Sequence, residues 1–238
     1  MRFITPLLDS IVDFISPPTC LHCESPLLQR DALFCTTCGE LMTLTPHHER
    51  CPRCFSAHYN TRRRKCSQCT KEKPIFKGCA SAFEYEGPPA TLIKKMKYHR
   101  QPFLAKGAGA YMTAQLITLD WPLPDIIVPV PMPRMRLIQR GYNQAKLLAE
   151  TIGHTIERPV LDILNKPSGE YPQTGQSLRQ RKTMPPGIIT LKKKNVLNNL
   201  TVLLVDDVIT TGTTLKQCGK TILDDGPCTL YAMTFCKT

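Results

Sequence analysis

Residues 202–214 read VLLVDDVITTGTT, and they are the most informative part of the sequence about its fold. The apolar run at its start predicts a buried strand, because strands covered on both faces are continuously apolar. Asp206 and Asp207 follow, and a turn containing Gly212 then leads into a predicted helix. This order predicts a parallel α/β sheet whose ligand lies beyond the carboxyl end of the strand.

The turn after the two acids has the groups that hold a phosphate. Backbone N–H groups of such a turn and of the helix N-terminus point at one place, and threonine hydroxyls add donors. The two carboxylates would repel that phosphate, so we expect them to accept hydrogen bonds from sugar hydroxyls beside it. A 5-phosphoribosyl group satisfies both requirements. The residues of the turn are Thr210, Thr211, Gly212, Thr213 and Thr214.

This stretch has two other interpretations. A Walker A loop is excluded, because no lysine follows the glycine at the required place. The second is a capped helix start that binds no ligand. The agreement of strand, acids, hydroxyls and glycine favours the phosphate site.

The chain after Cys79 alternates strand and helix signals, which predicts a parallel sheet with helices on both faces. A proline- and glycine-rich stretch from Lys166 to Gly187 predicts a long connection of the kind that forms a lid or a disordered insert. Predicted strands cover 80–85, 125–130, 160–164, 201–205 and 230–235, and predicted helices cover 89–98, 104–119, 143–156 and 213–223.

Eight of the twelve cysteines form four C-x-x-C pairs in the first third of the chain. A shift of 31 positions superimposes the first two pairs on the last two, which indicates an internal duplication. Two such pairs complete the tetrahedron of a closed structural zinc site, so eight thiolates predict two zinc ions. The predicted ligands are Cys20, Cys23, Cys35, Cys38, Cys51, Cys54, Cys66 and Cys69.

The cysteine segment has few large apolar residues, so bound metal is expected to take the place of a core. Sequential pairing, with one zinc per repeat, is the simplest arrangement, and the spacing also allows an interleaved one. Redox-active pairs are a weaker alternative, because no thioredoxin-like strand and helix surround them. The nearby histidines are expected at the surface. Residues 1–78 are therefore predicted to form a small zinc-binding module ahead of the sheet domain, residues 79–238.

Composition fits a globular protein, with 42% hydrophobic and 21% charged residues. The formal net charge of +12 falls to about +8 if two tetrathiolate zinc centres form. Residues 1–15 have apolar residues at helical spacing, which predicts an amphipathic helix that packs on the core or, alternatively, on a membrane surface. No signal peptide and no membrane span are indicated, so we expect a cytoplasmic protein with reduced thiols.

The acids and the threonine turn resemble the phosphoribosyl pyrophosphate signature of the type I phosphoribosyltransferases. The stretches Val128–Pro131 and Arg140–Gln144, together with the cysteine pairs, resemble the ComF family of competence-associated proteins across nearly the whole chain. Met184 and Glu170 depart from that family's pattern, where asparagine and threonine are usual. These departures concern the acceptor side of the site.

The resemblance implies phosphoribosyl pyrophosphate and Mg²⁺ as ligands. It also implies a link to DNA uptake and to competence or recombination proteins. Asp206 and Asp207 would hold the ribose, and the turn after Val128–Pro131 would hold the diphosphate. Arg134, Arg136 and Arg140 are its candidate partners, because the guanidinium fork suits phosphate oxygens.

A non-catalytic protein that binds single-stranded DNA or senses a nucleotide is the alternative function. The basic runs that would carry it are also expected as solvated surface. Only one of these runs has an aromatic residue beside it that could stack on a base. The runs are 62–65, 192–194, and 94–97 followed by Tyr98 and His99.

Overall fold

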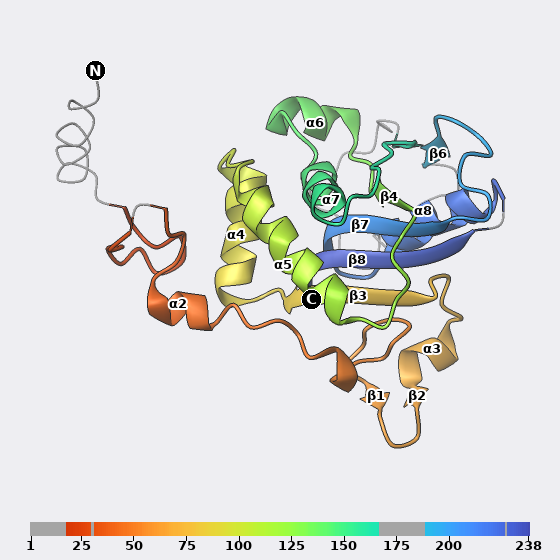
Figure 1. The fold of residues 1–238 in the computed structure, drawn as a ribbon, viewed down its shortest axis with the longest axis horizontal. Helices are drawn as coiled ribbons and strands as arrows, with labels where there is room; N and C mark the ends of the chain where they lie inside the picture. The colour runs from red at the N-terminus through yellow and green to blue at the C-terminus, as the bar shows by residue number, and fades with distance from the viewer. Residues whose placement is uncertain (1–17, 30, 167–188, 227) are drawn as a thin grey trace, which may run out of the picture.

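The computed structural model describes residues 18–29, 31–166, 189–226 and 228–238 (Figure 1). The predicted amphipathic helix over 1–15 lies outside the described residues, as does almost all of the predicted long connection. Within the described part of the chain, no helix is long and apolar enough to cross a membrane.

A four-stranded parallel sheet forms the centre of the molecule, in the order β3, β8, β7, β4. β7 and β8 pair over their whole lengths, and their midpoints carry apolar side chains that are fully buried. The parallel sheet confirms the predicted α/β class. The strands are β3 (Gly78–Glu84), β4 (Ile126–Pro129), β7 (Thr201–Ile209) and β8 (Thr229–Lys237).

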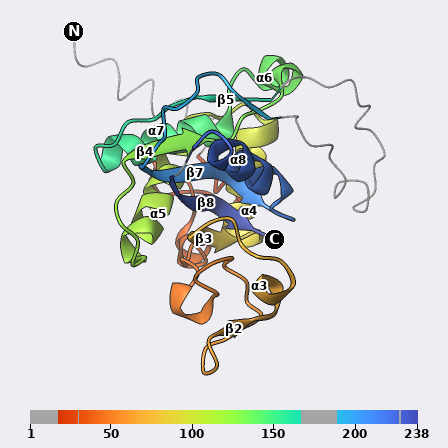
Figure 2. The same ribbon diagram turned by 90° about the vertical axis from the view of Figure 1, so that its right-hand side faces the viewer.

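Helices cover both faces of this sheet, as predicted (Figures 1 and 2). Alternate side chains of β7 supply the two cores: Leu203 and Val205 join one hydrophobic cluster, and Val202 and Leu204 join the other. Three helices contribute side chains to the first cluster; the last helix contributes to the second, together with Ala145 of the third helix. They are α4 (Gly87–Tyr98), α5 (Leu104–Thr118) and α7 (Gln144–Thr155), and α8 (Thr213–Leu223).

The two edges of the sheet have different neighbours. The Thr45 N–H donates to the carbonyl oxygen of Ala82 at 2.8 Å, so the N-terminal module partly covers the outer edge of β3. At the other edge the predicted strand over 160–164 is mostly wrong, because only Val160 pairs with Ile127. The chain then turns away into a small antiparallel ladder of β5 (Leu164–Asn165) and β6 (Thr190–Leu191).

Three features differ from or add to the sequence expectation. β7 continues through the two acids to Ile209, whereas the predicted strand ended at Val205. An unpredicted helix, α6 (Arg134–Arg140), follows β4 and has no buried residue. The cysteine-rich module contains the short elements α2 (Thr36–Glu40), η1 (His47–Glu49), β1 (Tyr59–Asn60), β2 (Lys65–Cys66) and α3 (Ser67–Lys71).

The segment at the predicted boundary between the module and the sheet domain contacts the sheet domain directly. Phe76 belongs to the second hydrophobic cluster, and the Lys77 N–H donates to the carbonyl oxygen of Leu230 at 2.8 Å. The division into residues 1–78 and 79–238 therefore stays a proposal, with the last residues of the first part built into the core of the second.

Glycines in α5 provide a test of how closely this helix packs. A Cβ added at Gly109 would lie 2.5 Å from the Cβ of Thr151 in α7, whereas one added at Gly107 would meet only Leu33, at 3.9 Å. We expect Gly109→Ala to lower the free energy of unfolding by about 1–3 kcal/mol through overpacking. Gly107→Ala is expected to raise it by about 0.5–1 kcal/mol through helix propensity. Urea midpoints of the two variants and the parent decide this; equal shifts would contradict the close contact.

Candidate functional site

The predicted phosphate turn lies between β7 and α8, at the carboxyl edge of the sheet. Gly212 has φ of +72°, a left-handed conformation that favours glycine, and occupies the N-cap position of α8. It has no side chain to cap the helix, and the first-turn N–H groups have no intrahelical acceptors. Within the described part of the chain, the Thr213 N–H donates to Thr211 Oγ1 at 3.4 Å, and the next N–H groups of the first turn are available to an anion.

The threonines of the turn are accessible at the surface. Thr210 and Thr211 are exposed, and Thr213 and Thr214 are half-buried. The hydroxyl oxygens of Thr211 and Thr213 lie 2.9 Å apart. The turn thus presents hydroxyl and backbone donors together, which is the arrangement that the sequence predicts.

The two acids face different surroundings, which the sequence did not indicate. They lie inside β7, where successive side chains point to opposite faces of the sheet. Asp207 is buried, and its Oδ1 lies 2.9 Å from the Nζ of Lys97 in α4. Only 18% of the Lys97 side chain and 12% of the Asp207 side chain are exposed, so solvent screens this ion pair weakly. Lys97 is therefore removed from the basic run proposed for DNA.

Asp206 is half-buried and accepts a hydrogen bond from the N–H of Asp207 at 2.8 Å. Burial and the negative charge of Asp207 raise the pKa of Asp206 to about 7, against the opposing positive charges of Lys97 and Lys166. Burial also lowers the pKa of the Lys166 ammonium. Lys166 is a cation that the sequence analysis missed, although its place just after a predicted strand end was a signal.

The arginines predicted for the diphosphate lie in α6, a helix where the sequence predicted a turn. The guanidinium of Arg140 lies 5.7 Å from the centre of the Tyr98 ring, and its Nη1 donates to Gln144 Oε1 at 3.1 Å. Arg134 and Arg136 are exposed. The structure brings Arg140 to the C-terminal end of α4.

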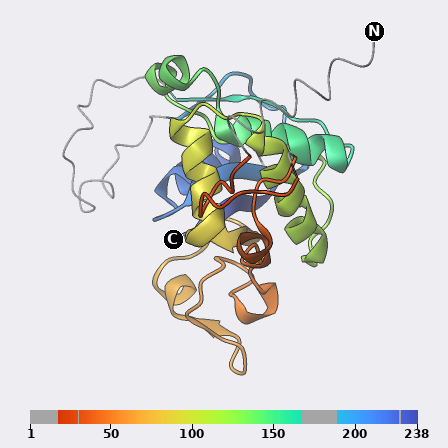
Figure 3. The same ribbon diagram turned by 90° about the vertical axis from the view of Figure 1, so that its left-hand side faces the viewer.

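The N-terminal part of α7 connects this helix region to the sheet. The side chains of Tyr142 and Gln144 both donate to the carbonyl oxygen of Met96, near the C-terminal end of α4. Asn143 caps α7 by accepting from the Ala145 N–H at 3.1 Å, and it also donates to Val130 O. α4, α6 and the start of α7 thus meet at the carboxyl edge of the sheet (Figures 1 and 3).

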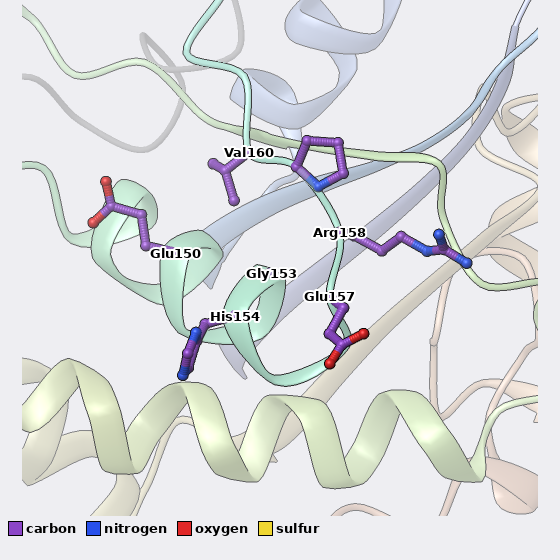
Figure 4. Close-up of a pocket in the computed structure, with 7 residues that line it drawn as sticks. Glu150, Gly153, His154, Glu157, Arg158 and Val160 are labelled. Atoms are coloured by element: carbon purple, nitrogen blue, oxygen red, sulfur yellow. The ribbon is translucent and has the colours of Figure 1, made fainter.

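A surface hollow of about 480 Å³ lies at the opposite end of α7. Figure 4 shows that the side chains of Glu150, His154, Glu157 and Arg158 point in different directions around it. They bring no group of functional atoms to one point. The hollow is therefore not part of the candidate phosphate site.

The eight predicted zinc ligands form two groups of four in which all sulfurs lie within 4.8 Å of one another. The grouping is sequential, Cys20 to Cys38 and Cys51 to Cys69, so the interleaved alternative is wrong. The Sγ atoms of Cys23 and Cys35 lie 3.6 Å apart. Ligands at about 2.3 Å from a tetrahedral zinc ion lie about 3.8 Å apart, whereas a disulfide needs about 2.05 Å. Both groups therefore fit zinc.

The duplication is visible in the backbone. In each repeat the N–H of the first cysteine donates to a serine carbonyl five residues later, Cys20 to Ser25 and Cys51 to Ser56. The residue before that serine, Glu24 or Phe55, has positive φ and donates its N–H back to the first cysteine. The same turn, 31 residues apart, presents two sulfurs to one ion.

The other cysteines and histidines agree with the prediction of structural and surface roles. Cys79, Cys218 and Cys236 are buried thiols, and Cys228 is half-buried. The histidines near the cysteines belong to neither four-sulfur group. His22, the one beside the first group, contacts Thr91 Oγ1 at 2.8 Å.

We expect two zinc ions per chain in protein purified without chelator, because both groups have the spacing of a closed tetrathiolate site. Cys66→Ser with Cys69→Ser should leave one zinc ion, as should Cys35→Ser with Cys38→Ser. Metal analysis checks this, with Cys228→Ser as the control that keeps both ions. A parent value near one would mean that one repeat does not bind.

Comparison with known proteins shows which proteins this chain resembles. A phosphoribosyl transferase domain matches residues 140–238. Competence protein F of Haemophilus influenzae is 29% identical over 207 residues, covering 84% of this chain and 89% of that protein. DNA utilization protein YhgH of Salmonella typhi is 25% identical over 237 residues, covering 93% and 98%. Competence protein ComFC of Bacillus subtilis is 24% identical over 210 residues, covering 87% and 78%. The chain is thus similar in sequence to competence protein F and to ComFC, and it has two four-cysteine groups ahead of a phosphoribosyltransferase-like parallel sheet.

Proposed function

We propose that this protein binds phosphoribosyl pyrophosphate together with Mg²⁺ at the carboxyl edge of its sheet and transfers the phosphoribosyl group to an acceptor. The observation that carries the proposal is the uncapped start of α8 behind Gly212, next to two carboxylates of β7. An anion and a sugar diol require these two kinds of group side by side.

In this proposal the turn from Thr210 to Thr214 donates to the 5-phosphate, and Asp206 and Asp207 accept hydrogen bonds from the ribose hydroxyls. Asp206 is half-buried and can reach a ligand at the edge directly. Asp207 has one carboxylate oxygen on Lys97, so its second oxygen remains for a hydroxyl. The ion pair with Lys97 orients that carboxylate.

The diphosphate would lie toward α6, where Arg134, Arg136 and Arg140 follow β4. The carboxylate of Asp206 is a hard oxygen ligand of the kind that Mg²⁺ prefers, and it would accept hydrogen bonds from waters bound to Mg²⁺. Mg²⁺ bound with the diphosphate supplies neutralisation of the leaving group's charge. Arg140 would have to exchange its contact with Gln144 for a phosphate oxygen.

The reaction needs no protein nucleophile. The bond between the ribosyl C1 and the diphosphate oxygen breaks, pyrophosphate leaves with the electron pair, and a bond forms between C1 and the acceptor. Positive charge grows on C1 and the ring oxygen as the bond breaks, so the protein's contribution is to hold donor and acceptor in line. The stretch predicted to cover the acceptor lies outside the described residues, so the proposal names no acceptor.

The relatives named for competence and DNA utilization support a role for this chain in the uptake or use of DNA. Competence or recombination proteins as partners and a cytoplasmic location are part of the same proposal. The phosphoribosyl ligand is supported by the matching domain and by the geometry of the turn.

We expect Asp206→Ala to weaken binding of phosphoribosyl pyrophosphate with Mg²⁺ at least tenfold, because a hydrogen bond to a charged group contributes about 1.5–3 kcal/mol. Asp207 needs a different substitution, since Asp207→Ala would leave Lys97 buried without its partner. Asp207→Asn combined with Lys97→Met removes both charges together and is expected to weaken binding similarly. Isothermal titration measures this.

Asp224→Ala, at the other end of α8, is the matched control and should bind as the parent does. Zinc content should stay at the parent value in every variant. Equal affinity of the Asp206→Ala variant and the parent would move the ribose site elsewhere. A parent that binds no phosphoribosyl pyrophosphate at all would overturn the transferase proposal.

A second candidate function, binding of single-stranded DNA, is favoured by the surface at the C-terminal end of α4. Tyr98 is 71% exposed and lies beside Arg140, and Arg100 donates to Gln139 O of α6 at 3.3 Å. Exposed aromatic rings with neighbouring cations stack on bases and neutralise phosphates. The basic run over 62–65 lies far from this surface, on the β1–β2 hairpin (Figure 1).

We expect binding of single-stranded DNA to weaken as salt rises, with a slope that falls by about 0.7 for each phosphate contact removed. Lys94→Ala with Lys95→Ala should therefore flatten the salt dependence. Tyr98→Ala should cost about 1–3 kcal/mol of binding free energy without changing the slope. The triple variant Arg62→Ala, Arg63→Ala and Arg64→Ala, in the β1–β2 hairpin, is the comparison. If only this variant flattens the salt dependence, single-stranded DNA binds to the cysteine-rich module instead.

A further inference from the structure

The two four-cysteine groups contact different parts of the sheet domain. The first repeat packs on the α4 and α5 side, where Leu21, Leu33 and Phe34 adjoin the first hydrophobic cluster and His22 contacts Thr91. The segment that leaves the second repeat packs in the other cluster, on the α8 side. The same zinc-binding unit thus has two different neighbours.

The segment after the second repeat lies directly against α8. Glu72 follows α3, the helix that contains Cys69, and its carboxylate forms an ion pair with Lys216 in the first turn of α8. A Cβ added at Gly219 of α8 would lie 3.2 Å from both Ile75 and the Phe76 ring. The helix therefore touches this segment with its backbone surface.

Phe76 is the main apolar contact in this segment. It is 8% exposed and belongs to the cluster that includes Leu215, Cys218 and Ile222 of α8. The exposed ion pair between Glu72 and Lys216 contributes little by comparison, because solvent screens it. The placement of α8 thus depends more on Phe76 than on charge.

The second repeat is fastened to the sheet on both sides. Before it, Arg50 adjoins Cys51 and its Nη2 lies 2.8 Å from Glu84 Oε1 at the end of β3. After it, the Lys77 N–H donates to Leu230 O of β8. The four sulfurs between these attachments are held close together in the folded chain. Metal at this group would therefore restrain both ends and, with them, Phe76.

We infer that Phe76 is a positioning residue through which the second four-cysteine group holds α8, and with it the phosphate turn, in its binding conformation. The identity of the ligand rests on the proposed function. Two sites that both stabilise the same conformation of one element are coupled, and each strengthens binding at the other to the same extent. Zinc at the second group should strengthen ligand binding at Thr210–Thr214, and ligand there should slow zinc loss from the second group.

Three variants test the role of Phe76 while leaving all eight cysteines in place. Phe76→Ala should retain two zinc ions but weaken binding of phosphoribosyl pyrophosphate with Mg²⁺ by fivefold or more. Phe76→Leu, which keeps most of the side-chain volume of Phe76, should bind phosphoribosyl pyrophosphate nearly as tightly as the parent. Leu33→Ala, which removes a contact of the first repeat near α5, is the matched control and should bind as the parent does. Unchanged affinity in Phe76→Ala would overturn the inference.

Hydrogen exchange tests the inference without any ligand, so its outcome is independent of the proposed function. In the parent, a chelator added in limited amounts should remove zinc, and loss from Cys51–Cys69 should speed exchange in α8 while α5 stays protected. Loss from Cys20–Cys38 should leave α8 protected. If the exchange rate in α8 does not change when zinc is lost from the second group, the inference is overturned, even if Phe76→Ala fails to fold.

The chelator experiment repeated with phosphoribosyl pyrophosphate and Mg²⁺ separates the two proposals. Selective slowing of zinc release from the second group supports the coupling, and equal slowing at both groups, or none despite measurable binding, contradicts it. If the parent binds no phosphoribosyl pyrophosphate, the proposed function fails and the exchange of α8 alone decides the role of Phe76.

Discussion

The parallel pairing of β7 with β8 holds together the centre of the sheet and positions the two acids. It extends from Thr201 to Ile209, four residues past the last pair that β7 makes with β4. Among the described strands, the last part of β7 therefore pairs with β8 alone, and this part contains both acids. A strand that is buried in its first half and half-open in its second can both support a core and present carboxylates to a ligand.

This arrangement also explains which parts of the fold the sequence predicted. The apolar start of β7, the helix start behind Gly212 and the grouping of the cysteines depend on neighbours along the chain, so a local pattern identified them. The continuation of β7 through Asp206 and Asp207 depends on β8, because aspartate disfavours strands by itself. The ion pair of Lys97 with Asp207 joins residues 110 positions apart, a distance at which a single sequence contains no signal.

The duplicated cysteine unit shows the same division between local and tertiary information. Both copies form the same turn with the same hydrogen bonds, since the turn is determined by the few residues between the cysteines. Their surroundings differ, because one copy adjoins α4 and α5 and the other is followed by a segment that packs on α8. A repeat in sequence therefore predicts equal metal sites, but it does not predict equal roles for them.

The two adjacent acids at the carboxyl edge have different electrostatic surroundings on the two faces of β7. Two ionised carboxylates in succession would repel each other and any phosphate nearby. Lys97 balances Asp207 on one face, and on the other the pKa of Asp206 is raised by burial and by the charge of Asp207. The raised pKa of Asp206 opposes a second full negative charge beside the turn. The strand can thus place two acids beside a phosphate turn without making that turn repel its ligand, because the pleat separates the acids and Lys97 offsets one of them.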